Sequence, residues 1–245
     1  MKKSQQEWVK DVIFHIIQTM NKYNGDMSTT GYTYGIKGFI DQYSIILRTK
    51  DDENISLFQS YLSNFKKGYF EHVLMSKAAY EILRECAEGK LKMTSEQLKK
   101  KLHGEHMTPM AYTRLHLNEL VKNKNTLSKE EIKKGIDYAF THAKYCLITK
   151  EESVLLDGKG CVFSSEEIRD FLKVYKTIHP NLSQKEENDY IELKGKKKSC
   201  FGFGAIRLFA LQKSKNPKVV FVDSKGNTKG FSECVANLED ENHNV

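Results

Sequence analysis

The chain has 245 residues, 39% hydrophobic and 29% charged, with a formal net charge of +7. This length permits one large domain or two small ones, and the modest positive charge favours a polyanionic partner only weakly. The cysteines include no CxxC pair, which argues against a zinc knuckle, and free thiols in a reducing cytoplasm are the simplest interpretation. No apolar run approaches the roughly 18 residues of a membrane span, so no membrane partner is expected.

Periodic apolar residues predict helices through most of the first 180 residues. In 5–22, Trp8, Val12 and Ile16 recur at helical spacing. A capping box of Thr94 and Gln97 opens a short helix. Further helices are expected at 55–89, 110–124, 127–144 and 164–178, with a short strand at 144–149.

The pattern changes after Pro180. Residues 189–196 alternate as a strand does, 200–212 are apolar and aromatic, and 218–223 predict a strand before a turn. The expected fold class is α+β, with a predominantly helical N-terminal two-thirds and a small β-rich basic C-terminal region. The expected divisions are a helical region at 1–180, a β-rich basic region at 181–238 and a disordered acidic tail at 239–245.

The segment KLHGEHMTPM, residues 101–110, concentrates polar chemistry in a short space. The ordinary interpretation is a polar junction between two helices, with Pro109 in the first turn of the second. Two histidines three residues apart with a glutamate between them are also suited to binding a metal or acting as a base.

Glu105-His106-Met107-Thr108-Pro109 resembles the acidic-His-x-x-Pro start of the HNH, or ββα-metal, nucleases. The resemblance implies Mg²⁺ or another divalent metal bound by Glu105, with His103 as an accessory ligand. It also implies that His106 is a general base that activates water against a phosphodiester. Such a site needs a further His, Asp or carboxamide within about 4–5 Å of Glu105.

Residues 189–194, DYIELK, are a second candidate. On a strand, Glu192 and Lys194 would share one face. That arrangement is similar to the (D/E)-x-K half of the PD-(D/E)xK nucleases, in which the carboxylate holds Mg²⁺ and the lysine orients water. Asp157 is the nearest candidate for the other acidic half, and a solvated strand face is the alternative interpretation.

No carboxylate occurs between Glu192 and Asp223, whereas lysines are frequent there. Lysines beside phenylalanines combine phosphate neutralisation with base stacking. The alternative is that the phenylalanines fill the core and the lysines are solvated. The expected nucleic-acid-binding residues are Lys194, Lys196, Lys197, Lys198, Phe201, Phe203, Arg207, Lys213 and Lys215.

These features together predict a metal-dependent endonuclease of restriction or phage-defence type that hydrolyses DNA phosphodiesters. An enzyme that cuts palindromic sites would be a homodimer. The alternatives are a non-catalytic nucleic-acid-binding or regulatory protein with a helical interaction surface, and a helical module that binds only proteins. A steep dependence of affinity on salt would separate the nucleic-acid binders from the protein-binding module.

Overall fold

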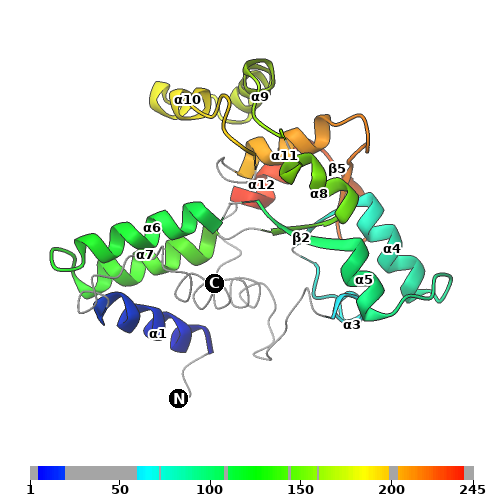
Figure 1. Ribbon diagram of the computed structural model, residues 1–245, viewed down its shortest axis with the longest axis horizontal. Helices are drawn as coiled ribbons and strands as arrows, with labels where there is room; N and C mark the ends of the chain where they lie inside the picture. The colour runs from blue at the N-terminus through cyan, green and yellow to red at the C-terminus, as the bar shows by residue number, and fades with distance from the viewer. Residues whose placement is uncertain are drawn as a thin grey trace. The chain divides into compact units, whose positions relative to one another are not determined.

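The computed structural model describes residues 5–19, 60–71, 73–107, 110–142, 145–158, 160–198 and 204–239 (Figure 1). The chain divides into two compact units. Unit 1 comprises Met1–Leu57, Met110–Lys144 and Glu241–Val245, and unit 2 comprises Phe58–Pro109 and Tyr145–Asp240. This division does not fall at the boundary expected at residue 180. Residues 110–144 belong to unit 1 and stand between the two segments of unit 2.

The described part of unit 1 is helical. Helices α1 (Gln5–Thr19), α6 (Met110–Asn123) and α7 (Lys129–His142) pack on one another, as the periodicity predicted. Ile17 of α1 and Ile132 and Ile136 of α7 are fully buried. The Nζ of Lys124 donates hydrogen bonds to the carbonyls of Ile17 and Gln18 at 3.2 and 3.3 Å. These bonds satisfy carbonyls that α1 leaves without helical partners at its C-terminal end.

Unit 2 contains a mixed five-stranded sheet with the order β2-β3-β1-β4-β5. Strand β3 pairs parallel with β1 and antiparallel with β2, and the β1–β4 and β4–β5 pairs are antiparallel. The strands are β1 (Leu74–Ser76), β2 (Leu102–His106), β3 (Tyr145–Thr149), β4 (Phe221–Val222) and β5 (Thr228–Lys229).

Helices and strands of unit 2 share one hydrophobic core. Leu74 and Ile148 of the sheet belong to the same buried cluster as Phe171, Leu208 and Val235 of the helices. The helices are α3 (Tyr61–Lys66), α4 (Lys77–Ala87), α5 (Ser95–Lys101), α8 (Lys150–Asp157), α9 (Ser165–Ile178), α10 (Gln184–Ile191), α11 (Gly204–Lys213) and α12 (Phe231–Glu239). No helix in the described ranges is long and apolar enough to cross a membrane.

The α+β class is confirmed, and the strand predicted at 144–149 is β3. The finer arrangement differs from the expectation. The helix expected across 55–89 is interrupted by β1. The strands expected at 189–196 and 200–212 are wrong, because α10 runs to Ile191 with turns after it, and α11 occupies the second segment from Gly204 onward. Seven consecutive residues of α11, Ala205 to Leu211, are buried. A helix buried on all sides has no polar face, so its apolar run resembles that of a strand.

The described C-terminal residues are therefore not mainly β-structure, since β1, β2 and β3 all precede residue 150. The acidic tail predicted at 239–245 lies outside the described residues apart from Glu239, which ends α12.

Candidate metal centre

The HGEH sequence lies on a strand and not in a loop. Strand β2 pairs with β3 along its whole length, from Leu102 opposite Thr149 to His106 opposite Tyr145. Because successive side chains of a strand point to opposite faces, His103 and Glu105 share one face and His106 lies on the other. The strand thus separates the two histidines that flank Glu105.

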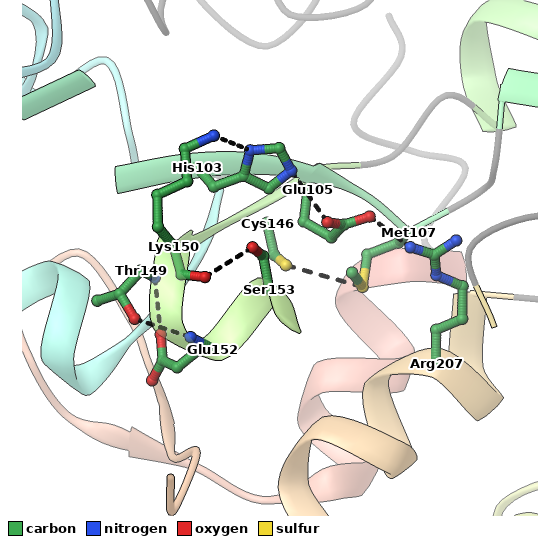
Figure 2. A network of polar contacts seen from close by, with 9 residues as sticks. All are labelled: His103, Glu105, Met107, Cys146, Thr149, Lys150, Glu152, Ser153 and Arg207. Atoms are coloured by element: carbon green, nitrogen blue, oxygen red, sulfur yellow. Dashed lines mark hydrogen bonds and ion pairs between the residues drawn. The ribbon is translucent and has the colours of Figure 1, made fainter. Parts of the chain in front are cut away.

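Glu105 is a buried carboxylate, 4% exposed, with a cation on one side and an imidazole on the other. Its Oε1 accepts a hydrogen bond from the guanidinium of Arg207 on α11, and its Oε2 lies 3.1 Å from Nε2 of His103 (Figure 2). Burial alone raises the pKa of this carboxyl group. The close contact with His103 and the charge of Arg207 together outweigh burial, so the pKa of Glu105 lies below its ordinary value. Glu105 is therefore ionised at neutral pH.

Lys150, the first residue of α8, determines which nitrogen of His103 carries the proton. Its Nζ lies 3.1 Å from Nδ1 of His103 (Figure 2). An ammonium group has only donors, so Nδ1 accepts and the proton of the neutral imidazole is assigned to Nε2, which faces Glu105. A polar chain thus runs from Lys150 through His103 to Glu105 and Arg207.

Asp157, the last residue of α8, completes a group of three metal-ligand types. One ligand atom from each of His103, Glu105 and Asp157 lies within 4.8 Å of the others. Partial burial, followed by the charge of Glu105, raises the pKa of the Asp157 carboxyl group. A metal site of the kind expected from the sequence needs a second ligand within about 4–5 Å of Glu105, and the carboxylate of Asp157 lies within that distance.

The donor set fits a divalent cation. Two carboxylates suit hard cations, and an imidazole extends the choice to Mn²⁺ and Zn²⁺. Asp157 is exposed and the His103 side chain is 30% exposed, whereas Glu105 is buried. Three protein ligands with one side open to solvent are typical of catalytic metal sites, whereas structural sites are closed by four ligands.

The two histidines of this segment have different surroundings. The ring of His106, expected to act as the general base, lies 4.6 Å from that of Tyr145, centroid to centroid. His103, expected only as an accessory ligand, makes the direct contact.

The second predicted site does not have the geometry that it required. Glu192 is the C-cap residue of α10, and Lys194 lies in the turn that follows, with both side chains exposed. The argument that they share a face depended on a strand, so the E-x-K arrangement is wrong. Asp157, named as its acidic partner, lies beside Glu105 instead.

The predicted nucleic-acid residues have different environments. Lys198 pairs with Glu167 at 2.7 Å. Arg207 is 1% exposed and pairs with Glu105. The prediction that its guanidinium contacts a phosphate is therefore wrong, because the guanidinium forms a buried ion pair. Phe201 and Phe203 lie outside the described residues. The exposed members are Lys194, Lys196, Lys197, Lys213 and Lys215.

Sequence reasoning did not connect Asp157, Lys150 and Arg207 with Glu105. No local spacing links these residues, because they come from helices 45 or more positions away that the sheet pairing brings to β2. Comparisons with family models, curated proteins and solved structures found no match, so the candidate site rests on the geometry of this chain.

Proposed function

We propose that this protein is a metal-dependent endonuclease that hydrolyses DNA phosphodiesters, with His103, Glu105 and Asp157 as the metal-binding residues. The observation that carries the proposal is the convergence of these three ligand types within 4.8 Å on one face of β2. The resemblance to HNH nucleases and the positive net charge support nucleic acid as the substrate. The restriction or phage-defence setting is supported by that resemblance alone.

Each residue of the cluster has a distinct role in the proposal. Arg207 holds Oε1 of Glu105, which leaves Oε2 for His103 and the metal. Asp157 and His103 provide the solvent-facing side from which a phosphodiester can approach. A bound divalent cation would stabilise charge on the phosphate and lower the pKa of a water molecule.

A second candidate function is non-catalytic nucleic-acid binding. It is favoured by the pairing of charges within the cluster, where Arg207 pairs with Glu105 and Lys150 contacts His103. Without a metal, this network would hold β2 against α8 and α11 as a purely structural feature.

Metal binding and cleavage separate the two candidates. Calorimetric titration with Mn²⁺ is expected to show one site in the wild type, weakened at least about tenfold by Asp157→Asn. The matched control is Asp170→Asn, which removes an exposed carboxylate of α9 outside the cluster. Plasmid cleavage with Mg²⁺ or Mn²⁺ should follow the same order, and Glu192→Ala should cut like the wild type.

A wild-type protein that binds no Mn²⁺ and cuts no DNA would leave only the second candidate. Cleavage that survives Asp157→Asn but not Glu192→Ala would move the site to α10.

A further inference from the structure

A groove of about 490 Å³ lies between α9 and α10, which Figure 1 draws side by side. Of the described residues that line it, four are cationic and one, Glu187, is a carboxylate, which Lys176 holds at 2.7 Å. The four cationic residues, here called the basic groove residues, are Arg169, Lys173, Lys176 and Lys194, and all are exposed.

Three of the basic groove residues lie along α9. Arg169, Lys173 and Lys176 are spaced four and three positions apart, so they form one stripe along the helix. Glu166 and Asp170 lie on the same helix but do not line the groove.

The floor of the groove is aliphatic. Ile168 and Leu172 are buried at its base, and Ile191 of α10 is 48% exposed beside them. Arginine and lysine lay their methylene stems along such a surface and keep their charged groups at the rim. The groove therefore presents a row of cations above an apolar floor.

We infer that the basic groove residues bind the sugar–phosphate backbone of a nucleic acid strand. From Arg169 to Lys176 the helix rises roughly 10 Å, at 1.5 Å per residue. A strand of duplex DNA carries one phosphate per 3.4 Å of rise, so the stripe spans about three phosphates. The exposed Lys196 and Lys197 follow Lys194 after Gly195 and extend the positive surface beyond the groove.

The groove binds without reading sequence. Among the residues that the structure describes, the lining includes no aromatic side chain on which a base could stack, and the cations are suited to phosphates. The groove would hold the backbone of the DNA that the proposed endonuclease cuts. That the bound nucleic acid is the substrate rests on the proposed function. Arg169, Lys173 and Lys176 lie outside the carboxylate-free segment that drew attention in the sequence.

The test is fluorescence anisotropy with a labelled 20-base-pair duplex in EDTA, so that binding is measured without cleavage. The double variant Arg169→Gln/Lys173→Gln is expected to reduce the slope of log affinity against log salt by about 1.8, because each phosphate contact contributes about 0.9. At 0.1 M salt, a slope reduced by that amount corresponds to roughly a 60-fold loss of affinity for the duplex. Two duplexes of unrelated sequence should bind equally.

The matched control is Lys185→Gln/Lys225→Gln, which removes the same charge from exposed positions outside the groove. The control should keep the wild-type slope, and both variants should keep the wild-type circular dichroism spectrum, since the changed side chains are exposed. Equal slopes in the groove variant and the control would overturn the inference. So would a groove variant that loses binding to labelled polyglutamate but not to DNA, because an acidic protein would then be the ligand.

Different results would contradict the proposed endonuclease and the proposed nucleic-acid contact of the groove. Wild-type protein that binds DNA through the groove but cuts nothing with any divalent metal would remove the proposed endonuclease and retain the groove. Protein that cuts DNA and is insensitive to the groove changes would remove the groove and retain the endonuclease.

Discussion

Arg207 and Glu105 are almost completely buried, and each supplies the charge that compensates the other. The pair connects α11 to β2, elements that lie about one hundred residues apart in the chain. Removal of one partner leaves a buried charge without compensation, which is more destabilising than the loss of both charges together.

Replacement of Arg207 is therefore expected to destabilise unit 2 strongly. Arg207→Met should lower the free energy of unfolding by about 3–5 kcal/mol, and the double change Glu105→Leu/Arg207→Met should recover much of that loss. Urea denaturation of the single and double variants measures both quantities. A loss below about 1 kcal/mol in the single variant would show that the pair is not an important source of stability.

Lys150 is expected to oppose metal binding in the proposed centre. A metal bound at Nε2 of His103 requires the proton on Nδ1, where Lys150 now donates a hydrogen bond. Lys150→Gln replaces that donor with a carbonyl oxygen that accepts the Nδ1 proton, as partners of metal-binding histidines usually do.

Mn²⁺ affinity is expected to rise roughly fivefold in Lys150→Gln, about the contribution of one hydrogen bond. Calorimetric titration measures it, and Lys101→Gln, at an exposed site on α5, controls for the general loss of positive charge. Equal affinities in the two variants would show that the His103 tautomer does not limit metal binding.

At the scale of helices and strands, capping was the feature best predicted from sequence. Thr94 and Gln97 form the expected capping box of α5, and Thr149 forms a capping box with Glu152 at the start of α8. Caps are predictable because their hydrogen bonds join residues only three positions apart. Helix α11 was mistaken for a strand because its environment is set by distant elements and not by its own neighbours.

The capping box of α10 makes a pH-dependent contribution to stability. Hydrogen bonds from the Ser183 side chain and backbone lower the pKa of Glu186 below its ordinary value of 4.5. Because the folded-state pKa is the lower one, this stabilisation is present above pH 4.5 and is lost as the pH falls through the folded-state pKa.

Glu186→Gln keeps a carbonyl acceptor at this position but has no titratable group. Wild-type protein should be the more stable of the two at pH 7, and the difference should shrink between pH 5 and pH 3. Urea denaturation at pH 7, 5 and 3 gives the comparison. A difference that stays constant over this range would contradict the assignment.

At the scale of the whole molecule, residues 110–144 interrupt unit 2 between two paired strands. His106 of β2 lies opposite Tyr145 of β3, so the two ends of the interruption are neighbours in the sheet. Directly opposed residues of an antiparallel pair have Cα atoms about 4.5–5.5 Å apart, a gap that a short turn can span. The buried cluster around Phe171 comes entirely from unit 2.

Unit 2 is therefore expected to fold without unit 1. A shortened chain that joins 58–107 to 145–239 through a four-residue Gly- and Asn-containing turn should unfold in one cooperative thermal transition. Circular dichroism at increasing temperature tests this, with the full-length protein as the reference. A gradual, non-cooperative loss of signal would show that unit 2 depends on unit 1.

The α+β class, the strand at 144–149, the main helices of unit 1 and the capping box of α5 could be predicted from the amino-acid sequence, because they follow from local periodicity and from hydrogen bonds over three or four residues. The sequence also indicated Glu105 and His103 as metal ligands. The three-dimensional structure was needed to find that β2 turns His106 away from Glu105, that Arg207 is buried, and that Asp157 lies beside Glu105. Those outcomes depend on sheet pairing and core packing between distant segments, which no spacing along the chain records.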